Sequence, residues 1–379
     1  MLWETVETPA TGHMVELTGL ASSTAYDVAI VSSSAGQTSR KNLSFTTAPA
    51  PSQVQGSIRD GVLLVNGEPF FPLLVWEQCP VQWQASLNAG INLFAAGSPC
   101  ADPASTASAL DGRALVAGTD GAAGRLGSFY PDEADARGLT GASLPALPAG
   151  IRFLTLTAHF ASMAAPLPSG RDIYPGLVAA ADVVGFDFYP LQELCRRDLL
   201  PADFDAQREL EALAPGKPTF QWIEARGLRC GTAPGVAITP STIRTESWLA
   251  VAAGAHGLGF FPPDWDNFAA PVIRGISARI RQLGPALLQP VQPVSVERGP
   301  DVRASVRSYH DALYVIAVNA GTTASSVRLT VPGLGDRLLH VLGAPITIQA
   351  GGGAFNDILG PLRLRIYVVA PRTGDAQSP

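Results

Sequence analysis

The sequence has few of the features that would place it among membrane proteins or nucleic-acid-binding proteins. No apolar run approaches the roughly 20 residues of a membrane-spanning helix, and no block of Lys and Arg interrupts a chain with a formal net charge of −6. Nucleic acids and anionic lipids both bind basic surfaces, so we expect neither as a partner. A neutral or polar ligand suits this charge better.

Histidine and cysteine are also scarce, with 5 and 4 residues in a chain of 379. The histidines form no HxH pair, and no two cysteines stand at the CxxC spacing of zinc sites. No GxSxG nucleophile elbow is present, and the GGG run at 351–353 does not join a strand to a helix as a phosphate-binding loop does. We therefore expect no metal, no cofactor and no serine nucleophile.

The sequence does contain eight short apolar runs, separated by turn-rich or helical stretches. Continuous apolar strands joined by crossovers are typical of a parallel sheet, and eight of them in about 200 residues indicate a closed barrel. The expected fold class is therefore α/β, a (β/α)8 TIM barrel flanked by small all-β sandwich modules. The predicted strands are Phe71–Trp76, Asn92–Ala96, Ala114–Ala117, Gly127–Tyr130, Phe153–Thr157, Val183–Phe188, Thr219–Ile223 and Gly257–Phe261.

The outer helices are less regular than the strands. Val81–Ala89 and Arg244–Ala253 have helical patterns, the second opened by a Thr-Pro-Ser cap at 239–241. Residues 118–126, GTDGAAGRL, are too few for a helix. We therefore expect either that the third unit has no helix or that the third strand lies elsewhere.

Alternating patterns flank the barrel on both sides. Before it, the expected strands are Val15–Leu17, Tyr26–Val31 and Leu43–Thr46, and this stretch resembles the C-terminal half of a fibronectin type III domain. Hairpin turns follow at Asp60-Gly61 and Asn66-Gly67. After Gly284 a second sandwich is expected, which resembles the small module behind many glycosidase barrels. Its strands are Ser305–His310, Leu313–Asn319, Val327–Val331 and Leu362–Val369, and the expected domains are 1–50, 51–288 and 289–379.

Catalytic residues of such barrels lie at the C-terminal ends of the strands. The informative positions are therefore the polar or aromatic residues at the end of each apolar run. They are Trp76, Glu77, Asp132, Glu133, His159, Asp187, Tyr189, Glu224, Asp264 and Trp265.

Two carboxylates stand out among them, Glu133 in FYPDEAD and Glu224 in FQWIEAR. Their places after the fourth and seventh strands resemble clan A glycoside hydrolases over residues 55–285. The resemblance implies that Glu133 is the acid/base and Glu224 the nucleophile of a retaining hydrolase acting on an oligo- or polysaccharide. A covalent intermediate requires the two carboxyl groups to lie about 5–5.5 Å apart.

The residue before the acid/base departs from that family. Many clan A enzymes carry Asn there, whereas this chain has Asp132. Asp132 is thus either a substrate ligand or the acid itself. Glu133 has the alternative of a solvated loop carboxylate, and Glu224 that of a strand-end carboxylate paired with Arg226 or Arg229.

The remaining candidates are expected to bind substrate, although each has a structural alternative. Tyr189 resembles the tyrosine that hydrogen-bonds the nucleophile in related enzymes, and Trp76 and Trp265 offer flat apolar faces to a sugar ring. The alternatives are ordinary ones, namely core packing for the tryptophans and Trp222, loop hydrogen bonding for His159, and ion pairs for Asp187 and Glu77.

The strand order also brings the cysteines together in pairs. Cys79 and Cys100 follow the first two strands, and Cys195 and Cys230 follow the sixth and seventh, so two disulfides or four free thiols are the alternatives. Disulfides favour an oxidising compartment. The start of the chain lacks a signal-peptide pattern but opens inside an apparent sandwich. We expect a secreted or cell-surface monomer, with a non-catalytic carbohydrate-binding or adhesion protein as the alternative function.

Overall fold

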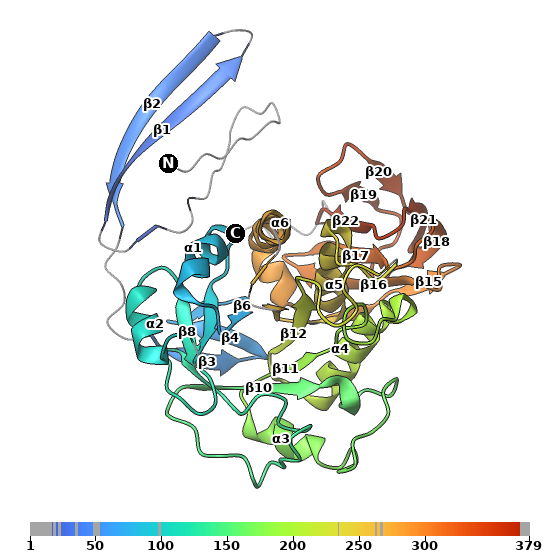
Figure 1. Ribbon diagram of the computed structural model, residues 1–379. Helices are drawn as coiled ribbons and strands as arrows, with labels where there is room; N and C mark the ends of the chain where they lie inside the picture. Colours follow the sequence, from blue (N-terminus) through green and yellow to red (C-terminus); the bar gives the residue numbers. More distant parts are fainter. Residues whose placement is uncertain are drawn as a thin grey trace, which may run out of the picture.

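The computed structural model shows a closed barrel of eight parallel strands, two further β-sheets after it and a β-hairpin before it (Figure 1). The predicted strand Val15–Leu17 lies outside the described residues except for its last position. The structure describes residues 17, 20–21, 24–34, 37–47, 54–97, 100–233, 235–261, 264–265 and 268–371.

All eight predicted barrel strands are present, each within two residues of its expected bounds. They pair in parallel, each with the next along the chain, and the last strand, β13, pairs with the first, β6, to close the barrel. The strands are β6 Leu73–Trp76, β7 Leu93–Ala96, β8 Leu115–Gly118, β9 Gly127–Phe129, β10 Ile151–Thr157, β11 Val183–Asp187, β12 Thr219–Glu224 and β13 Gly257–Phe261.

Alternation along each strand fills the inside of the barrel with large rings. Phe220 and Trp222 of β12 point inward and join Phe129 and Phe153 in one buried cluster. The neighbouring strands make room for these rings with glycine. A Cβ atom on Gly185 or Gly259 would overlap the ring of Phe220 or Trp222, respectively. Alternate large and small residues are how a narrow barrel packs its interior.

Six helices surround the barrel, and two of its crossovers have none. The chain passes from β8 to β9 without a helix, as residues 118–126 predicted, and from β9 to β10 by turns alone. Thr239 caps α5 through its side chain, as expected. The helices are α1 Pro80–Asn88, α2 Pro103–Ala109, α3 Tyr174–Ala180, α4 Ala202–Leu213, α5 Pro240–Ala253 and α6 Ala269–Leu283.

A small sheet leads into the barrel, as the two predicted turns required. Its strands are β3 Gly56–Arg59, β4 Val62–Val65 and β5 Glu68–Pro69. Leu63 of β4 is buried in the same cluster as Leu74 and Ile151 of the barrel strands. The lead-in sheet therefore covers the interior residues of the barrel.

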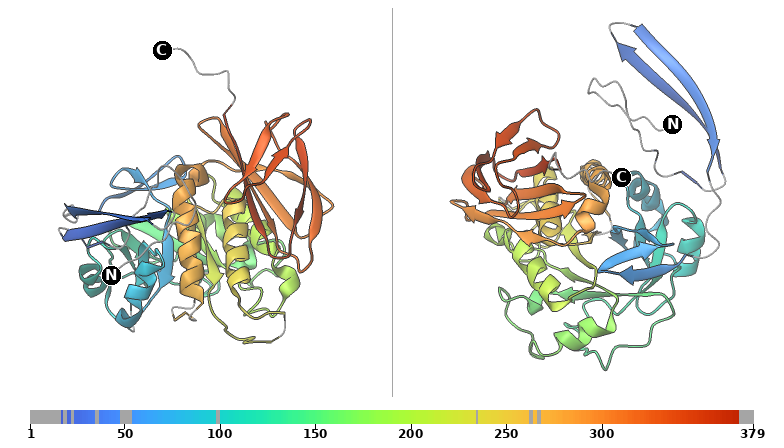
Figure 2. Two further views of the ribbon diagram at one scale, coloured as in Figure 1. Left: turned by 90° about the horizontal axis from the view of Figure 1, so that it is seen from above. Right: turned by 180° about the vertical axis from the view of Figure 1, so that it is seen from behind.

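Two antiparallel sheets follow α6 and share a separate core. The six-stranded sheet runs β14-β16-β17-β22-β19-β20 and the three-stranded sheet runs β15-β18-β21. Helix α5 packs against β16, β17 and β22, which joins these sheets to the barrel (Figure 2). The strands are β14 Gln292–Pro293, β15 Ser295–Glu297, β16 Val302–Tyr309, β17 Ala312–Asn319, β18 Ser325–Thr330, β19 Leu338–Val341, β20 Thr347–Gln349, β21 Ala354–Leu359 and β22 Leu364–Val369.

The amino-terminal region forms a hairpin of β1 Ala25–Ser34 and β2 Gln37–Thr46, which extends away from the barrel (Figure 1). Both expected strands are present in antiparallel register. Large apolar side chains on the hairpin remain exposed, among them Ile30 and Phe45. The fibronectin resemblance stays a prediction, because two strands do not make a sandwich.

Candidate active site

A group of carboxylates gathers at the C-terminal ends of the barrel strands. We call it the mouth cluster and define it as Glu77 after β6, Asp120 after β8, Asp132 and Glu133 after β9, and Asp187 at the end of β11. Electrostatic repulsion links its members, since Asp132 is affected by Glu133, Asp120 and Glu77, and Asp187 by Asp132 and Glu133. The fold thus brings together acids from four strands.

Asp132 and Asp187 form the centre of the mouth cluster. Burial raises the pKa of Asp132 to about 6, with a further contribution from the charge of Glu133. Burial also raises the pKa of Asp187 well above its usual range, and the nearby charge of Asp132 adds to it. Like charges close together in a poorly solvated place do not both ionise readily. Burial and repulsion therefore both oppose ionisation of these two groups together.

Tyr189 fixes the position of Asp187. The two side chains lie on the inward-facing side of β11 and its extension, and the tyrosine hydroxyl donates a hydrogen bond to one carboxyl oxygen of Asp187. The ring of Tyr189 stacks on Phe261 at the end of β13, with centroids 5.7 Å apart. The resemblance predicted that the Tyr189 hydroxyl contacts Glu224. In the structure it contacts Asp187 instead.

Glu77 and Thr119 connect the first three strands at the mouth. The hydroxyl of Thr119 lies 3.0 Å from Oε1 of Glu77 and 2.9 Å from the carbonyl oxygen of Ala96. Burial raises the pKa of Glu77, and the Thr119 hydrogen bond partly opposes that effect. Glu77 is therefore held in place as a partly desolvated carboxylate.

Three members of the mouth cluster occupy strained backbone. Glu77, Asp120 and Glu133 have φ angles of 35°, 48° and 48°, in the left-handed region that favours glycine. Such positions cost on the order of 1–3 kcal/mol each and concentrate at functional sites. Three acidic residues in this conformation at the ends of three strands therefore make the mouth the candidate active site.

Asp135 holds the turn that carries Asp132 and Glu133 in place. This carboxylate is 1% exposed and accepts hydrogen bonds from Thr157, through N at 2.9 Å and Oγ1 at 2.6 Å, and from the Tyr174 hydroxyl at 3.0 Å. Asp135 thus ties the turn to β10 and α3, and it has no oxygen left for a substrate.

Glu224 has surroundings that differ from those of the mouth cluster. Its side chain is fully buried, and its two oxygens accept hydrogen bonds from the backbone N–H groups of Gln192 at 2.7 Å and Leu191 at 3.2 Å. Asp203 of α4 and Glu246 of α5 are buried beside it. We call these three the inner acid cluster. Burial raises the pKa of Glu224 to about 7, and in this conformation its carboxyl group has no exposed surface.

The other predicted ligands divide between the mouth and the scaffold. His159 lies close enough to Glu133 to oppose the rise in its pKa that burial causes. Its Nδ1, however, lies 2.6 Å from the carbonyl oxygen of Ala165, which fits the alternative of loop hydrogen bonding. Trp76 contacts Trp222 and Phe129 edge to face inside the barrel. Trp222 is 3% exposed and belongs to the core, which was the alternative considered for it.

The residues after β13 lie with the outer layer. Trp265 packs edge to face on Phe260, whose side chain belongs to the core outside the barrel. Asp264 makes an ion pair with Arg226. Glu224 therefore does not pair with Arg226, the partner suggested by sequence, and Trp265 is not placed among the mouth carboxylates.

Both predicted cysteine pairs form disulfides. Cys79–Cys100 joins the segments after β6 and β7, and Cys195–Cys230 joins those after β11 and β12, with Cα–Cα distances of 4.9 and 5.7 Å. Cys195 of the second disulfide lies three residues after Gln192, whose backbone N–H donates to Glu224. The order of the strands predicted which cysteines would be paired, and the structure has the disulfides rather than the free thiols.

Three residues that act at the mouth were missed, namely Thr119, Asp120 and Asp135. The first two follow the third strand, so the search for polar residues after apolar runs finds them once it is applied to that strand. Asp135 has no such signal, because its partners on β10 and α3 are 22 and 39 positions away.

The described part of the chain contains no group of three or more His, Cys, Asp or Glu side chains arranged to hold a metal ion. Nor does any of its described helices combine the length and hydropathy needed to cross a bilayer.

Comparisons with known proteins support the fold. No family model matches the sequence, and no curated protein does. A noncanonic maltogenic α-amylase from Thermotoga neapolitana matches with a TM-score of 0.51 and 11% identity, over 78% of this chain and 98% of that one. A GH30 endoxylanase from Clostridium papyrosolvens has a TM-score of 0.47 and 11% identity, over 84% and 100%. An α-amylase from Geobacillus thermoleovorans has 0.41 and 17%, over 58% and 54%.

The chain spans about half the length of the first two α-amylase structures that it matches, 54% and 53%. At these identities the likeness concerns the fold alone. It is the fold expected from the sequence, a (β/α)8 barrel with additional antiparallel sheets.

Proposed function

We propose that this protein is a glycoside hydrolase whose reaction takes place in the mouth cluster. The observation that carries the proposal is the pair Asp132 and Asp187, two acids from β9 and β11 whose pKa values are both raised by burial and by neighbouring carboxylates. Hydrolysis of a glycosidic bond needs one protonated and one ionised carboxyl group on either side of that bond. Environments that push two pKa values apart provide this pair.

The proton balance assigns a role to each acid. Asp187 retains its proton and protonates the oxygen of the leaving group, while Tyr189 occupies its other oxygen and orients it. Asp132 is ionised above about pH 6 and attacks the anomeric carbon, so that a glycosyl ester forms as the bond to the leaving group breaks. Water, deprotonated by Asp187, then hydrolyses the ester with net retention of configuration. This proposal replaces the expected pair of Glu133 and Glu224.

Glu133 and Glu224 receive supporting roles. Glu133 lies next to Asp132 on strained backbone and is proposed to bind a sugar hydroxyl, as are Glu77 and His159 at the same rim. Glu224 holds the backbone of Leu191 and Gln192, two and three residues after Tyr189. It is thus a positioning residue for the segment that carries Tyr189.

The proposal is tested by a screen of aryl glycosides and polysaccharides, followed by proton NMR of the first product formed from an active substrate. A retaining enzyme gives a product with the anomeric configuration of its substrate, and an inverting enzyme gives the opposite one. Product of inverted configuration would exclude the covalent role of Asp132. Absence of turnover on every substrate would exclude the hydrolase.

A second candidate is a carbohydrate-binding or adhesion protein on a barrel of glycosidase type. The burial of Glu224 favours it, because a pair of Glu133 and an accessible Glu224 is not formed. Calorimetry distinguishes the two, since a binding protein gives saturable heat with an oligosaccharide that is recovered uncleaved, whereas the hydrolase releases product.

We further propose that the protein is secreted or displayed on a cell surface, because its four cysteines form two disulfides. The proposed modules remain 1–50, 51–288 and 289–379. Detection of both disulfides in protein recovered from culture medium would support this location, and exclusive recovery from the reduced cytosol would contradict it.

A further inference from the structure

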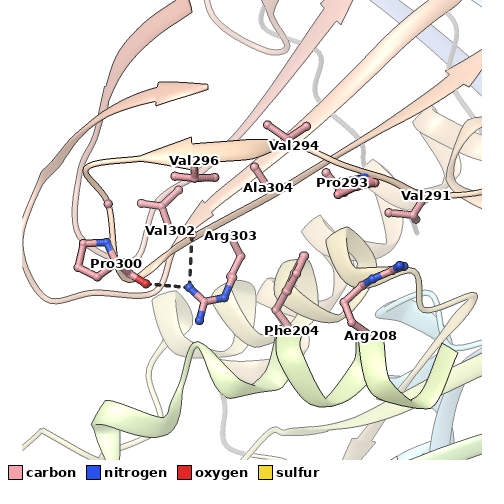
Figure 3. Close-up of a pocket in the computed structure, with 12 residues that line it drawn as sticks. Phe204, Arg208, Val291, Pro293, Val294, Val296, Pro300, Val302, Arg303 and Ala304 are labelled. Atoms are coloured by element: carbon pink, nitrogen blue, oxygen red, sulfur yellow. Dashed lines mark hydrogen bonds between the residues drawn. The ribbon is translucent and has the colours of Figure 1, made fainter. Parts of the chain in front are cut away.

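A crevice of about 350 Å³ lies between helix α4 and the strands β14 to β16 (Figure 3). Most of its lining is apolar, with Phe204 of α4 on one side and Val291 and Pro293 on the other. Its volume is within the lower part of the range found for ligand pockets. Among the described residues that line it, none belongs to the mouth cluster.

The charged side chains of the crevice are two arginines, and they are not equivalent. Arg303 donates to Asp205 through Nε at 2.9 Å and Nη2 at 2.7 Å, so its charge is balanced. Arg208 donates one hydrogen bond, from Nη1 to the carbonyl oxygen of Ala253 at 3.1 Å. No described carboxylate forms an ion pair with Arg208, whose guanidinium extends toward Val291 in Figure 3. Burial raises the pKa of Glu211, and the charge of Arg208 opposes that effect. Arg208 therefore lies near a carboxyl group but keeps N–H donors free on this side of the crevice.

Ser305 adds a polar group to the wall of the crevice. Its side chain is fully buried, it lines the crevice, and its hydroxyl has no hydrogen-bond partner among the described residues. A buried polar group without a partner loses about 1–3 kcal/mol relative to one that is paired. An acceptor placed in the crevice would relieve that cost.

The same face of β16 carries a second incompletely paired donor. Alternate residues of a strand point to one side, so Arg307 lies on the face that carries Ser305. Arg307 is fully buried, and its Nε and Nη1 have no partner in the described residues, while Nη2 donates to the carbonyl oxygen of Val251. Burial lowers the pKa of Arg307 to about 10. The face of β16 next to the crevice therefore carries donors without hydrogen-bond partners, and the charge of Glu211 acts on Arg307 there.

We propose that the crevice binds a small amphipathic carboxylate, an alkyl or aryl monocarboxylic acid in its ionised form. The apolar body lies against Phe204, Val291 and Pro293, and the carboxylate accepts hydrogen bonds from Arg208 and the Ser305 hydroxyl. A carboxylate matches the planar donors of a guanidinium and accepts through both oxygens. A cation is repelled there, and a neutral alcohol leaves the charge of Arg208 unmatched.

The site stands apart from the mouth cluster, so it does not depend on the proposed hydrolase activity. Its test uses the intact protein and isothermal titration calorimetry with 4-phenylbutyrate, together with the uncharged 4-phenylbutanol. The variants are Arg208→Gln and Ser305→Ala. Arg274→Gln serves as the matched control, because Arg274 is exposed on α6 and its loss changes the net charge equally.

The expected result is saturable binding of 4-phenylbutyrate to the wild type and to Arg274→Gln with the same affinity. Loss of a charged hydrogen bond weakens binding by about tenfold to a hundredfold, so Arg208→Gln and the alcohol should both fall in that range. Ser305→Ala should bind several times more weakly while unfolding at an equal or higher temperature. Arg208→Lys, which keeps the charge, should bind between the two if Arg208→Gln fails to fold.

Three results would overturn the proposal. Equal affinity for acid and alcohol would reduce the crevice to an apolar groove. Undiminished binding by Arg208→Gln would place the carboxylate elsewhere. Absence of saturable binding by the wild type would mean that the crevice is not a site for this carboxylate and that ordered water satisfies the donors of β16.

Discussion

The mouth cluster and the inner acid cluster contain the same chemistry in opposite settings. Both gather carboxyl groups whose pKa values are raised, first of all by burial. The acids of the mouth lie at strand ends and remain at least partly exposed, and three of them, Glu77, Asp120 and Glu133, are on strained backbone. Those of the inner cluster are 0–1% exposed, between β12, α4 and α5. A raised pKa is thus common to both, and access to a ligand separates them.

This comparison shows that a raised pKa alone does not identify a functional acid. Perturbed pKa values concentrate at functional sites, but buried structural networks perturb them as well. Glu224 is fully buried and its oxygens accept two backbone hydrogen bonds, so it does not reach a substrate. Its raised pKa therefore reflects the free-energy cost of burying a carboxyl group during folding. Asp132 forms no hydrogen bond with another described residue, so its raised pKa is available for chemistry. Changes that act on one cluster and spare the other test this distinction.

The largest expected effect is on turnover. Asp132→Asn and Asp187→Asn should each lower kcat by about a thousandfold or more, since a reacting acid or nucleophile contributes at least that range. Glu224→Gln should retain activity within about tenfold, because it acts through the segment that carries Tyr189. Initial rates on the active substrate, with circular dichroism to verify folding, provide the measurement. Equal losses in all three variants would erase the distinction between the clusters.

The second effect concerns stability, and it belongs to the inner cluster. Folded Glu224 holds its proton up to about pH 7, because burial raises its pKa to about 7 from an ordinary value of 4.5. The folded state thus binds more protons between these values, and its stability falls as the pH rises from 4.5 through 7. The loss amounts to up to about 3 kcal/mol, at about 1.4 kcal/mol per unit of pKa.

Urea unfolding of the wild type and Glu224→Gln across this pH range measures that effect. The variant should lose much of the slope, because it has no proton to release at this position. Glu68→Gln, at an exposed position of β5, is the control and should follow the wild type. Parallel curves for wild type and Glu224→Gln would show that Glu224 titrates normally.

The third effect is on the pH dependence of activity. The rate constant kcat/KM should rise about tenfold per pH unit up to about pH 6, where Asp132 ionises, and level off above it. It should fall again at higher pH as Asp187 loses its proton. Glu224→Gln should leave the acidic limb unchanged. A shift of the acidic limb in Glu224→Gln would show that the charge of Glu224 influences the ionisation of Asp132.

The smallest expected effect comes from backbone strain. Glu133→Gly should raise the free energy of unfolding by about 1 kcal/mol, because glycine accepts the φ angle of 48° without strain. Glu133→Ala removes the same carboxylate but keeps Cβ, so it should give no such gain. Both should lower activity if Glu133 binds substrate. A destabilised Glu133→Gly would mean that its backbone is not under strain.

Much of this architecture could be predicted from the sequence because its signals are local. Each barrel strand is a continuous apolar run, and the disulfides follow from the order of those runs. The state of Glu224 could not be predicted, because a carboxylate at a strand end has the same sequence context whether it faces the mouth or lies under a loop. Its burial depends on Leu191 and Gln192, more than thirty positions away.

The most direct test of the central claim is to trap the covalent intermediate. A 2-deoxy-2-fluoroglycosyl fluoride of the active sugar should label a retaining enzyme at its nucleophile. Cleavage after Arg and Lys separates the candidates, since Asp132 lies between Arg125 and Arg137 and Glu224 between Arg208 and Arg226. Tandem mass spectrometry should locate the sugar on Asp132. A sugar on Glu224 would contradict the account and return the nucleophile to the inner acid cluster.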